Sequence, residues 1–444
     1  VVALRIYGKH TNAAFKMPWI IVILAFPVFG LCIYGLFGHK EAMHKIIRKF
    51  EDVDAQLVPL NLQDETVVER LEAEDPMAAN QCYYIWKYGN YPVYDTTAVK
   101  FYPEAYLGYE EQLKELEKAK HFIFLEYHAI EEAEAFARLK DVLARKAAEG
   151  VEVRILYDDV GCIGFLDKSF IDRMNAIGVQ CRVFNYVVPF LNIFMNNRDH
   201  RKIMVIDGKV GFTGGYNLAD EYFNITHPYG YWKDTGVKLT GRAVQSFTMM
   251  FLEMWNVMGQ ADTDYEKYLK ALQEGAEDGN VQKASGYVQP YADSPLDGEP
   301  VGENVYLNLI KTAKKRLYVA TPYLIISDEM TRELGLAAKR GVDVRVFTPG
   351  IPDKKIIYGV TRSYYSGLNT PRAFCMRSRC SAMRIRRPSV PSIWITGACI
   401  IILKTVCGCT AVMPYGILRQ ILISCYRIVR KSPINTGMEG KIWQ

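Results

Sequence analysis

The sequence predicts an α/β fold: an N-terminal transmembrane helix followed by two duplicated α/β sandwich domains, the second incomplete. Apolar strand-like runs alternate with amphipathic helical stretches, which is the pattern of helices packed on a sheet. Residues 147–155 (AAEGVEVRI) are echoed by residues 338–346 (AKRGVDVRV), each with a glycine between a helical stretch and a strand. We interpret this echo as an internal duplication of one α/β unit.

Composition gives room for more than one core, because half of the 444 residues are hydrophobic. The net charge of +5 is unevenly distributed: residues 369–444 carry twelve Lys or Arg and one acid, so the first 368 residues carry −6. An acidic body argues against a nucleic-acid-binding protein, which would have a basic footprint. Six of the ten cysteines also lie after residue 368, and the remaining four are scattered, which fits a reducing compartment.

The first 40 residues form a predicted membrane segment. An uncharged, mostly apolar run covers residues 17–38, long enough for a bilayer-spanning helix that Pro27 would kink. Because the chain begins with Val1 rather than Met, we expect further sequence upstream. Basic residues flank both sides of the run, so charge orients it weakly; we favour a cell membrane location with the later domains on the cytoplasmic side. A polar, partly helical connector is expected over residues 41–98.

The first α/β domain is predicted over residues 99–259. A helix over residues 106–119 leads into a strand at 122–125, and a second helix ends near Gly150 before a strand at 151–157. A Gly-, Asp- and Pro-rich linker follows over residues 260–303, and residues 304–368 form the start of the second domain.

One constellation in the first domain carries candidate chemistry. Four apolar residues separate Lys202 from Asp207-Gly208, which predicts a buried strand ending in a hairpin turn. Side chains two apart on a strand share a face, so His200 and Lys202 should converge while Arg201 points away. Further on, Gly214 and Gly215 permit close backbone approach and Asn217 adds a donor. These groups suit a bound anion.

Three other histidines, His121, His128 and His227, match no motif, and we expect structural roles for them.

The full pattern, H-x-K-x4-D-x6-G-G-x-N, resembles the HKD signature of the phospholipase D superfamily, with Gly215 where many members carry Ser. The resemblance implies that His200 attacks phosphorus, that Lys202 and Asn217 hold the phosphate oxygens, and that no metal or other cofactor is needed. It also implies that Asp207 helps to orient a catalytic His, in this half or across the two halves. In that superfamily, the site combines one motif from each of two domains.

The apolar run, the approach at residues 197–202 and the stretch at 360–365 are together similar to the bacterial cardiolipin synthases. This resemblance implies a membrane enzyme that joins two phosphatidylglycerols into cardiolipin and releases glycerol, through a phosphohistidine. Phosphatidylserine synthase and a phospholipase D hydrolase are alternatives that differ in the acceptor, and a catalytically inactive membrane-bound remnant is a third. The apolar residues 186–195, just before the motif, are either a buried segment or a lipid-facing lip.

The tail departs from the expected pattern. No His follows His227, so the second motif cannot be found in the chain as written. With favourable synonymous codons, residues 375–378 read in another frame permit His-Ala-Lys, and codons downstream permit Asp and Gly-Thr-x-Asn at the spacing of the first motif. We therefore expect a frameshift near residue 368, a tail over 369–444 that is out of frame, and a chain that is inactive as written. A genuine second membrane segment over residues 393–413 is the alternative, against which Lys404 counts.

Overall fold

The computed structural model describes residues 1–8, 13–37, 41–184, 198–269, 286–293, 299–368, 373–377 and 399–403. The lip expected at residues 186–195, residues 270–285 and 294–298 of the linker, and most of the tail lie outside these ranges.

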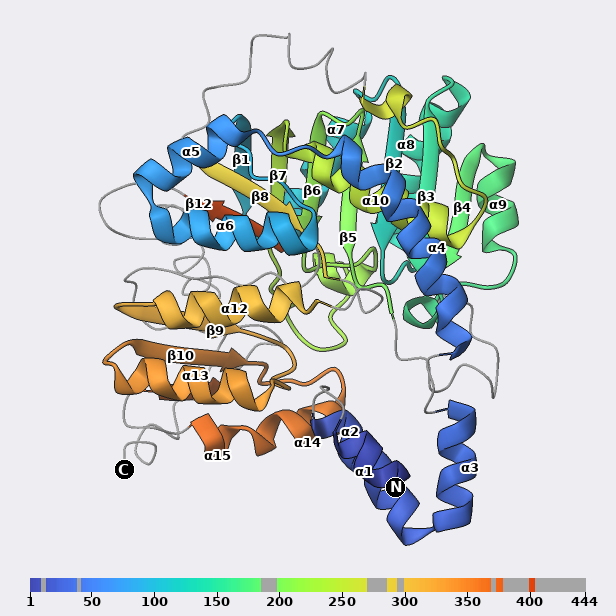
Figure 1. Ribbon diagram of the computed structural model, residues 1–444. Coiled ribbons are helices and arrows are strands. Elements are labelled where there is room, and N and C mark those ends of the chain that lie inside the picture. The colour runs from blue at the N-terminus through green and yellow to red at the C-terminus, as the bar shows by residue number, and fades with distance from the viewer. Residues whose placement is uncertain are drawn as a thin grey trace, which may run out of the picture.

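A mixed seven-stranded sheet forms the centre of the first unit, in the order β1-β7-β6-β5-β2-β3-β4 (Figure 1). Its strands are β1 Thr97–Tyr102, β2 Phe122–Tyr127, β3 Glu152–Asp158, β4 Val179–Phe184, β5 Lys202–Ile206, β6 Val210–Gly214 and β7 Gly236–Gly241. Strands β2, β3 and β4 run parallel, whereas β5 is antiparallel to β2 and is followed by antiparallel β6 and β7. The predicted α/β class is confirmed, and the strands expected at 122–125 and 151–157 are present.

Strand β5 lies in the middle of this sheet, and all five of its residues are buried. It pairs with β2 on one side, with Tyr127 opposite Lys202, and with β6 on the other. The predicted hairpin is also present: Asp207 and Gly208 have φ of 52° and 64°. Two positive φ angles are those of a type I′ turn, which matches the twist of the flanking strands. The start of β5 therefore lies at a fixed place beside the end of β2.

Helices cover both faces of the sheet and divide the core in two. The helices are α7 Ala105–Leu116, α8 Glu134–Ala148, η2 Val160–Cys162, α9 Phe170–Ala176, η3 Asp220–Phe223 and α10 Val244–Met258. Alternation along β2 sends Phe124 toward α10, where its ring stacks on Phe251, and sends Ile123 and Leu125 toward α7 and α8. The largely apolar α10 thus backs the sheet on the face opposite α7 and α8.

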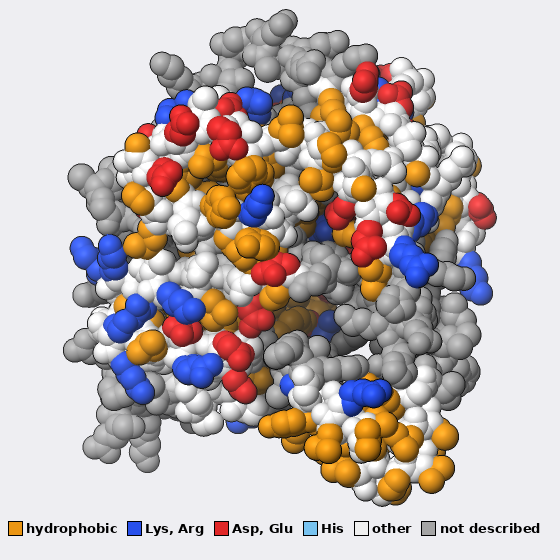
Figure 2. All heavy atoms as spheres, in the orientation of Figure 1, with side chains coloured by type: hydrophobic (Ala, Val, Ile, Leu, Met, Phe, Trp, Pro, Cys, Tyr) orange, Lys and Arg blue, Asp and Glu red, His pale blue; other side chains and the backbone are white. Residues whose placement is uncertain are grey.

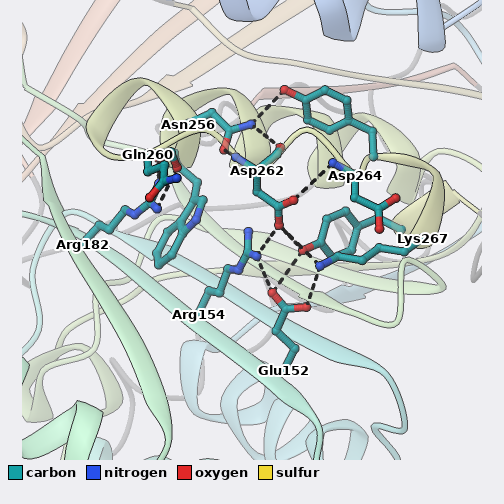
Figure 3. A network of polar contacts seen from close by, with 11 residues as sticks. Glu152, Arg154, Arg182, Asn256, Gln260, Asp262, Asp264 and Lys267 are labelled. Carbon is teal, nitrogen blue, oxygen red and sulfur yellow. Dashed lines mark hydrogen bonds and ion pairs between the residues drawn. The ribbon is translucent and has the colours of Figure 1, made fainter.

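A buried arginine ties the end of α10 to the sheet (Figure 3). Arg154 on β3 is 5% exposed and forms ion pairs with Glu152 and Asp262. Its guanidinium also lies 5.0 Å from the ring centroid of Trp255 and 5.6 Å from that of Tyr268. Burial raises the pKa of Asp262, but hydrogen bonds from Arg154 and Tyr268 outweigh it and hold the pKa at about 2. This cluster holds the segment after α10 against the sheet.

The second unit begins with a parallel three-stranded sheet, in the order β11-β10-β9. Its elements are α12 Val301–Thr312, β9 Arg316–Ala320, α13 Asp328–Lys339, β10 Asp343–Thr348, α14 Lys355–Ser363, α15 Tyr365–Leu368 and β11 Ala373–Arg377. Gly150 before β3 and Gly341 before β10 both have positive φ, 90° and 97°. The echoed stretches therefore have the same local structure, a helix, a left-handed glycine and a strand parallel to the preceding one.

A smaller layer lies beside the two units. It consists of η1 Val58–Leu60, α5 Glu65–Glu74, α6 Pro76–Gly89, β8 Tyr287–Tyr291 and β12 Cys399–Leu403, whereas the preceding helix α4 Glu41–Leu57 packs on α10 of the first unit. Strand β8 pairs antiparallel with β12, and α6 packs on α12. The connector predicted as partly helical is thus mostly helix.

The N-terminal region differs from the single helix expected over residues 17–38. The helices are α1 Val2–Tyr7, α2 Ala13–Ala25 and α3 Pro27–Phe37. Pro27 begins a new helix, since proline cannot donate the backbone hydrogen bond that would continue α2 but fits a first turn. The Trp19 and Tyr34 rings lie 5.3 Å apart, and a Cβ on Gly30 would lie 2.6 Å from the Val22 carbonyl oxygen, so α2 and α3 fold back on each other. Among the described residues, no helix combines the length and apolarity needed to cross a membrane.

Candidate active site

His200 and Lys202 meet where β5 begins. The Lys202 ammonium donates to the His200 carbonyl at 2.7 Å and lies 3.2 Å from the His200 Nδ1. An ammonium only donates, so while Lys202 is charged Nδ1 accepts and the imidazole is neutral. Nε2, on the other side of the ring, is the nitrogen left for a substrate. The two side chains that alternation predicted to share a face are therefore in contact.

Lys202 is a buried cation that has no counter-ion among the described residues. The residue is 1% exposed, and across the described ranges no carboxylate lies within ion-pairing distance of its nitrogen. Burial lowers the pKa of Lys202 to about 7, and the more distant carboxylates of Asp199, Asp234 and Asp158 offset only part of that effect. A buried ammonium with unused hydrogen-bonding capacity is stabilised by an anion that reaches it.

His200 is crowded by protein but remains exposed at the edge of the sheet. This crowding and the nearby charge of Lys202 lower the pKa of His200, with smaller contributions from His128 and Lys354. The imidazole is therefore neutral at physiological pH. A neutral, accessible imidazole is the form that can act as a nucleophile.

Arg201 turns to the opposite face, toward α10. Its guanidinium donates to the Met250 carbonyl and to Glu253, both at 3.2 Å, and lies 3.8 Å from Glu126 on β2. Glu126 is completely buried, and burial together with Asp199 raises its pKa well above the usual value. These charged groups hold Arg201 on the α10 side of the sheet. They do not line the opposite face, on which His200 and Lys202 lie.

Asp207 has a different place from the one predicted. It follows β5 at the end opposite His200, and its carboxylate accepts hydrogen bonds from the backbone amides of Lys120, His121 and Phe122 at 2.7–2.9 Å. These bonds fix the start of β2 beside the hairpin turn. Within this half of the molecule, Asp207 therefore does not orient His200, because the length of β5 separates them; its observed role is to align two central strands.

Gly214, Gly215 and Asn217 form the turn after β6. A Cβ on Gly214 would lie 2.6 Å from the Tyr216 ring, and one on Gly215 would lie 2.3 Å from an Asp234 carboxylate oxygen. The close approach predicted at these glycines is thus made to neighbouring side chains. The Asn217 oxygen accepts from the Ala129 amide at 3.2 Å, and its nitrogen donates to the Tyr222 hydroxyl at 2.9 Å. One amide hydrogen of Asn217 has no partner among the described residues.

Sequence reasoning missed three residues beside the motif: Asp158, Asp234 and His128. Asp158 is completely buried at the end of β3, and Asp234 packs against Gly215 before β7. Burial raises the pKa of each carboxyl to about 6. Asp158 could have been found, because polar residues that follow a buried parallel strand are frequent at α/β sites. His128 and Asp234 carried no such signal, since only the pairing of β5 brings them near Lys202.

The second unit reaches this site through the loop after β10. A Cβ on Gly230 would lie 3.3 Å from Ile351, and the Tyr323 hydroxyl donates to Asp353. The Lys354 ammonium lies 5.4 Å from the Tyr323 ring centroid. Its charge contributes to the lowered pKa of both His128 and His200. The open face of the site therefore carries positive charge from both units. Across the described ranges, no group of three His, Cys, Asp or Glu side chains converges to hold a metal ion.

Comparison with known proteins agrees with this class of site. The family described as "Cardiolipin synthase, PLD-like domain" matches residues 113–255 and 306–380, and the family described as "Phospholipase_D-nuclease N-terminal" matches residues 1–39. The fold and the His-Lys pair thus define a phospholipase D-like protein.

The relatives narrow this class. The chain is 40% identical over 353 residues to an uncharacterized protein of Streptococcus mutans, covering 79% of this chain and 75% of that one. It is 35% identical over 373 residues to a cardiolipin synthase of Geobacillus kaustophilus, covering 83% of this chain and 72% of the relative. The chain belongs to the cardiolipin synthase family. Among solved structures, a phosphatidylserine synthase of Haemophilus influenzae aligns with a TM-score of 0.43 at 13% identity, covering 61% of this chain and 68% of that one.

Proposed function

We propose that this chain is a phosphatidyltransferase of the cardiolipin synthase type, which uses His200 as nucleophile and Lys202 as phosphate ligand. One observation carries the proposal: the Lys202 ammonium is buried, has no counter-ion among the described residues and lies 3.2 Å from the Nδ1 of a neutral, accessible histidine. Phosphodiester transfer needs a cation that neutralises the phosphate oxygens and a nucleophile beside it. Membership of the cardiolipin synthase family supports phosphatidylglycerol as substrate and cardiolipin as product.

The proposed first step forms a bond between His200 Nε2 and phosphorus and breaks the bond from phosphorus to the headgroup glycerol. Attack by Nε2 needs the ring proton on Nδ1. When the Lys202 ammonium turns from Nδ1 to the phosphate oxygens, Nδ1 is free to carry that proton, and Lys202 stays charged as the phosphate ligand. The leaving glycerol takes a proton from an acid, which we expect from the second half of the protein. The glycerol hydroxyl of a second phosphatidylglycerol then attacks phosphorus, breaks the bond to His200 and gives its proton to the group that protonated the first glycerol, which yields cardiolipin.

We propose that the second half of the site is encoded beyond residue 368 in another reading frame. Residues 369–444 of the chain as written contain no His. Apart from β11 and β12, they lie outside the described residues. On this proposal, the 444-residue chain can form the phosphohistidine slowly but lacks the group that activates the second glycerol. Restoring the alternative frame after residue 368 should restore the complete reaction.

A membrane location of the protein is also part of the proposal. Apolar side chains cluster on the outer surface of α1, α2 and α3, at the lower right of the molecule (Figure 2). The exposed residues are Leu4, Tyr7, Met17, Ile21, Leu24, Phe26, Val28, Phe29 and Leu31. A surface this apolar is stabilised by lipid rather than water, and the enzyme must take its substrate from a membrane. We place the catalytic units on the cytoplasmic side.

The test is cardiolipin formation in phosphatidylglycerol vesicles by the frame-restored protein and its His200→Ala variant. We expect the variant to lose all measurable transfer, because the covalent route needs the imidazole. The matched control, His227→Ala, removes an exposed histidine and should leave the rate unchanged. Near-normal cardiolipin formation by His200→Ala would contradict the proposal. Supplying serine or water as acceptor separates phosphatidylserine synthase and hydrolase activities from cardiolipin synthesis.

A further inference from the structure

His128 lies directly against the proposed nucleophile. It follows the last residue of β2, and His200 precedes β5 by two residues, so antiparallel pairing brings both to the same edge of the sheet. The centroids of the two imidazoles are 4.7 Å apart, with ring planes inclined by 49°. The His128 side chain is 20% exposed. One face of the His200 ring is therefore in contact with another imidazole.

A hydrogen bond fixes the orientation of His128. Its Nδ1 lies 2.7 Å from the Asp199 carbonyl oxygen. A carbonyl only accepts, so Nδ1 carries the proton and Nε2 carries the lone pair in the neutral ring. Burial and the charge of Lys202 lower the pKa of His128 to about 4, which keeps this neutral form at physiological pH. His128 thus donates to the residue immediately before His200.

The surroundings leave His128 little freedom to move. A Cβ on Gly161 would lie 2.0 Å from the His128 carbonyl oxygen and 2.9 Å from its Nε2, so only glycine fits there. Asp158 completes the arrangement: its carboxylate accepts from the amides of Asp199 and Gly161, at 3.0 and 3.1 Å. The hydrogen bonds of His128 and Asp158 therefore join the ends of β2 and β3 to the residues just before β5, with the His128 imidazole at the centre.

We propose that His128 is a positioning residue for His200, which holds the Asp199 carbonyl with its Nδ1–H and supports one face of the nucleophilic ring. A side chain needed only for the core would not require both a donor aimed at the residue before the nucleophile and an aromatic face against the nucleophile. The positioning role rests on the proposed function. The packing of His128 on His200 can be measured without turnover.

The experiment compares three variants of the 444-residue chain. His128→Ala removes both the donor and the ring, His128→Asn retains an N–H near the position of Nδ1, and His128→Phe retains the ring face. The first readout is the rate at which diethyl pyrocarbonate modifies His200, followed by mass spectrometry of its peptide. The second readout is the rate at which phosphatidylglycerol vesicles label His200 with a phosphatidyl group. His227→Ala is the control, because that histidine is exposed.

We expect His128→Ala to raise the rate of His200 modification at least threefold and to lower the labelling rate at least tenfold, with the other histidines modified as before. Asn and Phe should each recover part of both effects. Should Ala not fold, the Asn and Phe variants decide, since loss of either contact alone must shift the same two rates in the same directions. Unchanged rates in all three variants would overturn the inference. Absence of labelling in the unsubstituted protein would instead count against the proposed function, and the modification rates would still decide the place of His128.

Discussion

Two buried cations lie in the same sheet, on the two strands that flank β2, and their surroundings differ. Arg154 on β3 has two carboxylates beside its guanidinium (Figure 3), and three aromatic rings lie around it. Lys202 on β5 has the carbonyl and Nδ1 of His200 as hydrogen-bond partners, and across the described ranges no carboxylate pairs with it. A cation whose counter-ions are built into the fold contributes to the core, whereas one whose counter-ion is missing is ready for an anionic ligand. The presence or absence of carboxylate partners therefore distinguishes the structural cation Arg154 from the functional cation Lys202.

The largest expected effect is on stability at Arg154. Arg154→Met leaves Glu152 and Asp262 without their cation, so the free energy of unfolding should fall by about 3 kcal/mol. Urea denaturation of the first unit measures this, with Arg145→Met as control because that arginine is half-exposed. An Arg154 variant as stable as the unsubstituted protein would remove the basis of the comparison.

The opposite outcome is expected at Lys202. Lys202→Met should lower the rate of phosphatidyl transfer by about 10²–10³-fold, which is the usual effect of removing one preorganised donor. The free energy of unfolding should stay the same or rise, because the variant no longer buries an uncompensated charge. Lys209→Met, at the far end of β5, is the matched control. A Lys202 variant that is both unstable and active would reverse our assignment.

Binding of an inorganic anion is a smaller effect that sharpens the same point. Sulfate at about ten times its Kd should raise the free energy of unfolding by about 1.4 kcal/mol. Its affinity should weaken as the pH rises through about 7, because the pKa of Lys202 is lowered to that value and the ammonium is lost above it. The unfolded lysine stays protonated to higher pH, so between about 7 and 10.5 stability without sulfate should rise with pH. Calorimetric titration at pH 6 and pH 9 tests this; equal sulfate affinity at both would show that Lys202 is not the ligand.

Lys354 should have the smallest effect. Its ammonium is exposed and carried by the loop after β10, so removing it with Lys354→Ala should weaken sulfate binding only about threefold, in line with other exposed charges. The neighbouring Lys355→Ala is the control. Identical affinities in both variants would mean that the second unit does not contribute charge to this site.

The sequence sufficed for the parts of the molecule that depend on local pattern. The alternation of helices and strands, the hairpin at Asp207-Gly208 and the shared face of His200 and Lys202 all follow from the periods of strands and helices. It did not suffice where distant strands pair. Asp207 was expected to orient a histidine in this half or across the two halves; within this half, the register of β5 against β2 places its carboxylate on three backbone amides. The contact of His128 with His200 could not be predicted for the same reason. Pro27 divides the N-terminal segment into two helices rather than kinking one.

The reading frame after residue 368 is the remaining prediction from the sequence. Resequencing the coding DNA around codon 369 tests it, because the alternative frame must then encode His-Ala-Lys and the rest of the second motif. A DNA sequence in which no frame after codon 368 encodes that motif would contradict the prediction. Activity of the 444-residue chain equal to that of the frame-restored chain would contradict the two-motif mechanism.

The central claim is that the His200–Lys202 pair is the phosphoryl-transfer centre. The most direct measurement is the mass of the peptide that carries His200 after the 444-residue chain is mixed with phosphatidylglycerol vesicles and quenched in alkali, in which phosphohistidine is stable. We predict a phosphatidyl adduct on His200, retained because the second step lacks its partner group, and no adduct in Lys202→Met. An adduct on a different residue, or none on His200 in a chain that still makes cardiolipin, would contradict the account.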